Sequence, residues 1–187
     1  MTADEILDEW SQMDAKHAAE TILPCNGSRA WAESVVRMRP VATVKELFAA
    51  SDSVWRRLPE SDWQEAFDSH PRLGERRAKA ATAQSLNWSA GEQSAANPDD
   101  AVREALAHGN REYEEKFGRI FLLCATGRST SEMLMILRER MQNDAATEVR
   151  EAAEQQRLIT RLRLRKWLQM PALTCAELVT SMRTEAA

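Results

Sequence analysis

The sequence predicts an all-α protein, a single-domain helical bundle of about eight helices with a long C-terminal helix. Apolar side chains recur every three or four residues through most of the chain, which is the helical period. Stretches of this kind follow matches to the capping box, in which Ser or Thr is followed three residues later by Glu or Gln. These matches are Thr2/Glu5, Thr43/Glu46, Ser61/Gln64, Ser129/Glu132 and Thr174/Glu177. No stretch convincingly alternates apolar and polar residues as a strand does.

Four helices are expected before Pro71. They cover residues 2–13, 28–39, 43–58 and 61–70. Pro40, Pro59 and Pro71 end the last three, because proline lacks a backbone N–H and disfavours the helical conformation in the residue before it. His70 therefore lies in an extended conformation at a helix terminus.

The middle of the chain is less regular. Residues 72–100 lack helical periodicity, and we expect mostly loop there, with a helix beginning near Ser89. Periodicity returns over residues 101–117. The run Ile120–Ala125 is continuously apolar, which fits either a buried strand or a buried irregular segment.

The last third predicts a helix from Ser129 and the longest helix from Asp144 to just before Pro171. The capping box at Thr174 indicates another helix start. No repeat or linker divides the chain, so we expect residues 1–187 to form one domain.

Composition points away from several classes of function. The chain has 187 residues, a net charge of -4 and a pI near 5.5, which argue against nucleic acid or an anionic membrane as the main partner. The N-terminus lacks the features of a signal peptide, and no apolar run is long enough to span a bilayer. Cys25, Cys124 and Cys175 show no metal-binding spacing, so we expect reduced thiols in a cytoplasmic protein.

His70 is the candidate acid–base residue. His17 and His108 lie among polar neighbours on predicted helices and are most simply surface residues. An imidazole at a helix end can transfer protons, but it can also cap the helix, where the dipole favours it. The spacing alone favours the structural alternative.

Glu92 and Gln93 follow Ser89 at the expected helix start. On one interpretation, Ser89 and Glu92 form an ordinary capping box. On the other, Glu92 orients His70 or holds substrate N–H groups, while free backbone N–H groups at the helix start bind a carbonyl oxygen. The residue pattern alone favours the capping box.

Arg163 lies four residues after Ile159, on the side of the longest helix that faces the core. A charge run such as Arg161–Lys166 is usually a solvated helix face. An arginine that faces the core needs a partner, and a substrate carboxylate is one candidate. Arg161 and Arg165 lie close enough to take this role instead.

Other conspicuous residues have structural explanations. The six tryptophans occur at helical spacing and are expected in the core. Cys124 is expected to be a small buried side chain rather than a nucleophile, because no charged neighbour would lower its pKa. No phosphate-binding loop, dinucleotide-binding glycine pattern or nucleophile elbow occurs.

Nine short motifs follow one another along nearly the whole chain. They are Gly27-Ser28-x-x-Trp31, Arg39-Pro40, Asp62-Trp63-x-x-Ala66-Phe67, His70-Pro71-Arg72-Leu73-Gly74, Ser89-x-x-Glu92-Gln93, Asn110-x-x-Tyr113-x-x-Lys116-Phe117-Gly118, Phe121-x-x-Cys124-Ala125-x-Gly127-Arg128-Ser129, Arg140-x-x-Asn143 and Ile159-Thr160-x-Leu162-Arg163-Leu164. Together they resemble the OHCU decarboxylases of urate breakdown. These enzymes convert 2-oxo-4-hydroxy-4-carboxy-5-ureidoimidazoline (OHCU) to (S)-allantoin and carbon dioxide.

The resemblance implies an all-helical homodimer that needs no cofactor or metal, with OHCU as substrate and allantoin as product. It makes His70 and Glu92 the catalytic pair and Arg163 the pocket arginine, which reverses the preference for structural roles. The implied substrate-binding residues are Pro71, Ser89, Gln93, Phe121, Leu122, Leu123, Cys124 and Ala125. Two alternatives stay open: a non-catalytic helical interaction module on the same scaffold, and an isomerase or hydrolase of a related cyclic ureide.

Overall fold

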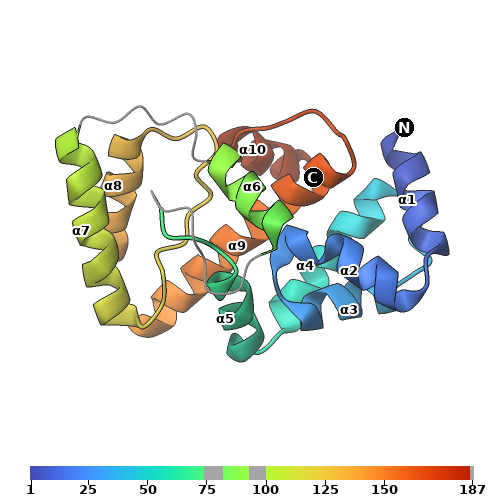
Figure 1. The fold of residues 1–187 in the computed structure, drawn as a ribbon, viewed down its shortest axis with the longest axis horizontal. Helices are drawn as coiled ribbons and strands as arrows, with labels where there is room; N and C mark the ends of the chain where they lie inside the picture. Colours follow the sequence, from blue (N-terminus) through green and yellow to red (C-terminus); the bar gives the residue numbers. More distant parts are fainter. Residues whose placement is uncertain (74–81, 93–99, 186–187) are drawn as a thin grey trace.

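The computed structural model confirms the all-α class (Figure 1). It describes residues 1–73, 82–92 and 100–185, and within these ranges it contains ten helices and no strand. The helices are α1 (Ala3–Gln12), α2 (Ala15–Asn26), α3 (Arg29–Arg37), α4 (Val44–Arg57), α5 (Glu60–Asp68), α6 (Ala83–Glu92), α7 (Asp100–Phe117), α8 (Thr130–Arg140), α9 (Ala145–Trp167) and α10 (Cys175–Glu185). None of these helices combines the length and the apolar character needed to cross a membrane.

Two differences from the prediction concern the number and order of the helices. α2 was not among the predicted helices. Only Met13 and Asp14 separate it from α1, and it begins as a new helix because the Asp14 side chain caps its first turn. α9 is the longest helix, with 23 residues, but α10 follows it. The long helix is therefore not the C-terminal one.

Most of the predicted helix starts are correct. The side chains that accept hydrogen bonds from the first turn of their helices include Thr2, Thr43, Ser129, Asp144 and Thr174. The prediction for Ser61 is wrong, because α5 begins at Glu60 with Pro59 at the N-cap position. Pro59 makes no side-chain hydrogen bond there, but its ring fixes the φ angle with which the chain enters the helix.

α9 runs through the middle of the molecule and joins two groups of helices (Figure 1). α7 and α8 lie side by side at one end, and α1 to α4 lie at the other. α9 packs against α2, α4, α5 and α10. Residues 156–161 of α9 are all buried, so the polar side chains in this stretch need partners inside the protein.

The apolar side chains form two cores. The larger one contains Trp10, Trp31, Trp55 and Trp88, with Trp63 and Trp167 packed against its edge, as the sequence predicted. The smaller one involves α7 and α8 and includes Leu106, Tyr113 and Leu137.

The apolar run between α7 and α8 is a buried irregular segment and not a strand. Leu122 and Cys124 pack into the larger core, whereas Phe121, Leu123 and Ala125 pack into the smaller one. Side chains of an extended chain point alternately to opposite sides. One segment therefore serves both cores, which explains why its sequence is continuously apolar.

The prediction of three reduced thiols is wrong for two cysteines. Cys124 and Cys175 form a disulfide bond, with their Cα atoms 6.2 Å apart, and sequence spacing could not pair residues 51 positions apart. The Cys175 N–H also donates to the Thr126 carbonyl oxygen (3.1 Å), so α10 is tied to the end of the buried segment. Cys25 is a free buried thiol, and burial raises its pKa to about 12 although Arg163 acts in the opposite direction.

A buried ion pair fastens the smaller core to α9. Arg140 on α8 pairs with Glu148 on α9, and their side chains are 6% and 0% exposed. The Tyr113 hydroxyl donates to the same carboxylate, as does Asn143 Nδ2 (2.8 Å). Arg140 Nη1 also donates to the Leu122 carbonyl oxygen (2.7 Å), so this network reaches the buried segment.

We expect Glu148→Ala to lower the free energy of unfolding by about 3–5 kcal/mol, because it leaves Arg140 buried without its charge partner. Urea denaturation followed by tryptophan fluorescence measures this loss. Arg37→Ala is the control, since Arg37 and Glu33 form an exposed pair 4.0 Å apart whose removal should change stability by less than about 1 kcal/mol. Equal losses in the two variants would contradict the structural importance of the network.

Candidate active site

The end of α5 brings His70 into the interior. α5 ends at Asp68, and the His70 N–H donates to the Phe67 carbonyl oxygen (3.0 Å), which completes the last turn. Pro71 cannot continue the helix because it has no N–H to donate. The His70 side chain is only 6% exposed. The other two histidines are exposed, as predicted.

Gly27 allows the end of α5 to approach α2 closely. It caps α2 with a φ of 98°, a left-handed conformation that residues with a Cβ rarely adopt. A Cβ atom at this position would lie 2.2 Å from Ser69 Oγ. Glycine is therefore required beside Ser69, the residue that directly precedes His70.

His70 lines a small cavity of about 20 Å³, which is room for about one water molecule. The other residues that line it are Pro71, Leu73, Ser89, Phe121, Leu122, Leu123, Ala125 and Ile159. Most of the substrate-binding residues that the resemblance implied thus meet around the imidazole. Cys124 does not line the cavity, because its side chain is bonded to Cys175 in the larger core.

Burial keeps His70 neutral. Removal from water holds the pKa of the imidazole well below its usual 6.5, and the positive charge of Arg163 lowers it further. The Gln156 side chain acts on this pKa in the opposite direction. A neutral imidazole can accept a proton, which is the form that a general base requires.

Polar side chains hold the backbone of the buried segment. The Cys124 N–H donates to Gln155 Oε1 (3.0 Å), and Arg128 Nε donates to the Cys124 carbonyl oxygen (3.1 Å). Within the described ranges, the N–H groups of Leu123 and Ala125 make no hydrogen bond. Phe121 and Leu122 line the cavity as well, and within the same ranges their N–H groups also make no hydrogen bond. The backbone of this segment therefore offers these donors beside the cavity, which a ligand oxygen could use.

Arg163 is buried beside the cavity, with 1% of its surface exposed. Its guanidinium donates to Ser85 Oγ (3.0 Å) and Ser89 Oγ (2.8 Å) on α6, and to the Pro24 carbonyl oxygen (3.4 Å) on α2. Arg163 therefore links α9 to both helices and reaches the cavity through Ser89.

The neighbouring basic side chains of α9 have other roles. Arg161 pairs with Asp52 (3.0 Å), and Arg165 donates to a backbone carbonyl in the loop after α9 (3.1 Å). Lys166 lies over the Trp88 ring, 5.6 Å from its centroid. Arg163 is thus the arginine of this run that donates to Ser89, a residue that lines the cavity.

The expected helix start at Ser89 is wrong. α6 already begins at Ala83, and Thr82 caps it by accepting a hydrogen bond from the Ser85 N–H (3.1 Å). Ser89 and Glu92 consequently lie near the C-terminal end of α6 and form no capping box. Binding of a carbonyl oxygen by free N–H groups at Ser89 is therefore excluded.

The side chains of two predicted site residues, Glu92 and Gln93, lie outside the described part of the structure. Glu92 is the last residue of α6, whereas the whole of Gln93 lies outside that part. Leu73, Ile159 and Gln156 were missed by the sequence-based interpretation and belong to the site. The sequence could have indicated Gln156 and Ile159 through their spacing, because residues 156, 159 and 163 share one face of a helix.

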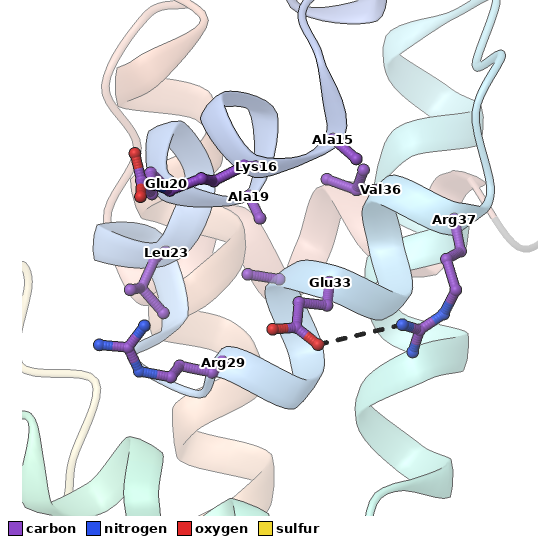
Figure 2. A pocket seen from close by; sticks show the side chains of 10 residues that line it. Ala15, Lys16, Ala19, Glu20, Leu23, Arg29, Glu33, Val36 and Arg37 are labelled. Carbon is purple, nitrogen blue, oxygen red and sulfur yellow. Dashed lines mark ion pairs between the residues drawn. The ribbon is translucent and has the colours of Figure 1, made fainter.

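A second hollow, of about 390 Å³, lies between α2 and α3 and shares no lining residue with the His70 cavity (Figure 2). Its walls combine small apolar side chains such as Ala19 with charged ones, including the Glu33–Arg37 pair drawn in Figure 2. It contains no histidine or cysteine. The His70 cavity is therefore the better candidate for proton-transfer chemistry.

The lowered pKa of His70 predicts how stability depends on pH. Below about pH 6.5 the unfolded chain protonates this imidazole, whereas the folded protein does not, so the unfolded state binds more protons. The free energy of unfolding should therefore fall as the pH is lowered from about 7.5 to 5, and it should fall less steeply in His70→Asn. Urea denaturation at each pH measures both slopes. Identical slopes would show that His70 is not buried in its neutral form.

Comparisons with known proteins agree with the resemblance. The family described as OHCU decarboxylase matches residues 11–165. The chain is 33% identical over 155 residues to the uric acid degradation bifunctional protein TTL of Arabidopsis thaliana, which covers 82% of this chain and 48% of that protein. It is 34% identical over 141 residues to 2-oxo-4-hydroxy-4-carboxy-5-ureidoimidazoline decarboxylase of Amia calva, covering 72% and 77%. The chain thus spans about half the length of the plant relative.

Solved structures share the fold. A crystal structure of OHCU decarboxylase in the presence of (S)-allantoin matches with a TM-score of 0.68 at 33% identity, covering 79% of this chain and 96% of that one. A crystal structure of (S)-allantoin synthase, at 20% identity, shares the fold with a TM-score of 0.67 and covers 89% and 54%. The match over most of the chain and the similarity to these relatives show that this protein belongs to the OHCU decarboxylase family.

Proposed function

We propose that this protein is a decarboxylase that converts OHCU to (S)-allantoin and carbon dioxide in urate breakdown. The observation that carries the proposal is the neutral, buried His70 in a cavity lined by residues that the family resemblance implied. The Amia calva relative bears the name of this activity, and the solved relative was crystallised in the presence of (S)-allantoin.

The proposed substrate supplies its own electron sink. The carbon that loses carbon dioxide bears a hydroxyl group and adjoins a ring C=N bond, which can accept the electrons of the broken C–C bond. The product of this step is an enol-like intermediate. Protonation of the neighbouring carbon on one face then sets the (S) centre, so the protein has to bind, orient and transfer protons.

His70 performs these proton transfers in our proposal. The neutral imidazole takes the proton of the substrate hydroxyl as carbon dioxide leaves, and the imidazolium returns a proton to the neighbouring carbon. The ring nitrogen takes up one proton from solvent, which balances the charge of the lost carboxylate. Glu92 orients the imidazole and, with Gln93, binds ureido N–H groups.

Two further groups bind the substrate in this proposal. The N–H groups of Leu123 and Ala125 donate to a carbonyl oxygen of the ligand. Arg163 supplies the positive charge that the substrate carboxylate needs. Because OHCU is much larger than one water molecule, the lining side chains must separate when it binds. An anion that accepts a hydrogen bond from Arg163 in place of Ser89 Oγ (2.8 Å) would break the bond between α9 and α6 at this point. α6, which carries Ser89, could then move away from the cavity.

We further propose that residues 1–187 form one domain and that the protein acts in the cytoplasm. The two cores share the segment 121–125, which supports one domain. A cytoplasmic protein is exposed to reducing thiols. Cys124 and Cys175 are 1% and 2% exposed, which shields their disulfide bond from attack by such thiols.

A homodimer is the proposed assembly. α8 exposes Met135, at 55%, in a hollow of about 580 Å³ that Val102 and Leu134 also line, and this apolar surface is available to a second copy. Sedimentation equilibrium should give a mass of about 42 kDa, which is twice the 21.1 kDa of one chain. A mass of one chain at all concentrations would contradict the dimer.

His70→Asn should lower kcat for OHCU by about 100-fold or more, because asparagine can form hydrogen bonds but cannot accept and return a proton. Carbon dioxide release and the optical activity of allantoin measure the two products. His17→Asn is the matched control, since His17 is exposed, and it should retain the wild-type rate. No release of carbon dioxide by the wild type would overturn the function and favour an isomerase, a hydrolase or a binding module. A wild-type rate in His70→Asn would overturn the role of the histidine.

A further inference from the structure

Two buried polar atoms at the site have no hydrogen-bond partner among the described residues: Nε2 of His70 and Oε1 of Gln156. Gln156 lies on α9 and is 0% exposed. Gln156 donates to the Asn26 carbonyl oxygen, and the next residue, Gly27, packs against Ser69, which directly precedes His70. The two side chains therefore lie near one another, although they form no hydrogen bond. Hydrogen bonds of catalytic groups are often poorly aligned before a ligand binds and tighten in the complex.

The orientation of the Gln156 amide is fixed by its nitrogen. Nε2 donates to the Asn26 carbonyl oxygen (3.0 Å) and to Thr160 Oγ1 (3.3 Å). A carbonyl oxygen can only accept, so the amide nitrogen and not the amide oxygen must face Asn26. The Gln156 Oε1 atom consequently points away from Asn26.

The groups that hold Gln156 are themselves satisfied. Asn26 Nδ2 donates to Thr160 Oγ1 (2.9 Å), and Asn26 Oδ1 accepts from the Ser28 N–H (3.2 Å). The Thr160 hydroxyl donates to the Gln156 carbonyl oxygen (2.9 Å). This buried network therefore ends in one unsatisfied acceptor, the Gln156 Oε1 atom, which costs about 1–3 kcal/mol unless a donor reaches it. Nε2 of His70 is the other buried atom of the site that lacks a partner among the described residues.

We propose that Gln156 is a positioning residue, which accepts a hydrogen bond from His70 Nε2–H and thereby fixes the tautomer of the imidazole. Nδ1 then carries the lone pair, and Nδ1 is the atom that exchanges protons with the substrate. The identity of the substrate rests on the function proposed above, whereas the tautomer is a property of the protein alone.

Nuclear magnetic resonance of protein labelled with ¹⁵N-histidine tests the tautomer directly. The chain has three histidines, so the signals that disappear in His70→Asn belong to His70. We expect a protonated Nε2 and an unprotonated Nδ1 in the wild type at about pH 7.5, where the imidazole is neutral, and a mixture of tautomers in Gln156→Leu. A protonated Nδ1 in the wild type would overturn the proposal without the need for any variant. Wild-type signals in Gln156→Leu would also overturn it.

Gln64→Leu is the matched control. Gln64 lies on α5, the helix that leads to His70, and its Nε2 donates to Asp68 Oδ1 (3.1 Å). The same chemical change at this position should leave the tautomer of His70 unaltered. An equal change of tautomer in Gln64→Leu and Gln156→Leu would attribute the effect to a general disturbance and overturn the proposal.

Kinetics provide a second readout that a merely structural role would not move. Gln156→Leu should lower kcat for OHCU by about 10- to 100-fold with KM nearly unchanged. Gln156→Glu should shift the acidic limb of the kcat/KM profile to higher pH, because a carboxylate stabilises the imidazolium. An unshifted limb would overturn the proposal. If the wild type fails to release carbon dioxide from OHCU, the proposed function fails, and the tautomer still decides the role of Gln156.

Discussion

The structure depends on hydrogen-bond partners for the backbone of the segment 121–125. This segment passes between two apolar cores and has no adjacent strand among the described residues to pair with. A buried N–H or C=O group without a partner costs about 1–3 kcal/mol. Arg140 and Gln155 supply part of this requirement from α8 and α9. The N–H groups of Leu123 and Ala125, two residues that line the cavity, are left without a partner within the described ranges. The constraint that shapes the core thus also leaves these backbone donors beside the candidate active site.

α9 connects this constraint to the chemistry of the imidazole. Consecutive residues on a helix point about 100° apart, so the adjacent side chains of Gln155 and Gln156 serve different neighbours. Gln155 accepts from the buried segment, and Gln156 lies beside His70. Arg163, two turns further along the same helix, holds α6 through its serines. A small movement of α9 would therefore displace the backbone donors, the imidazole and α6 together.

The fold class and most helix starts could be predicted, because caps such as Ser129 and Asp144 act within one turn of the chain. The start of α6 at Thr82 was missed, because the Ala and Ser side chains around it carry little apolar signal. The Cys124–Cys175 bond and the hydrogen bonds from Arg163 to Ser85 and Ser89 join residues far apart in sequence, so no local pattern could predict them. The motifs indicated which residues gather at the cavity, but not how their hydrogen bonds are arranged.

The charges of the site suggest why a neutral amide lies beside His70. In the free protein, the buried Arg163 contributes to the low pKa of the imidazole. The proposed substrate is an anion, so its carboxylate offsets the charge of Arg163 and raises the pKa of His70, which favours uptake of the hydroxyl proton. Once carbon dioxide has left and the ring nitrogen is protonated, the ligand is an enolate with one negative charge, and it becomes neutral only when the imidazolium returns its proton to carbon. With the neutral product in place, the positive charge of Arg163 again holds the pKa of the imidazole low, which restores the neutral base. A carboxylate in place of Gln156 would add a second negative charge beside the imidazole, in addition to that of Glu92, and would hold the imidazole in its protonated form when a neutral base is needed.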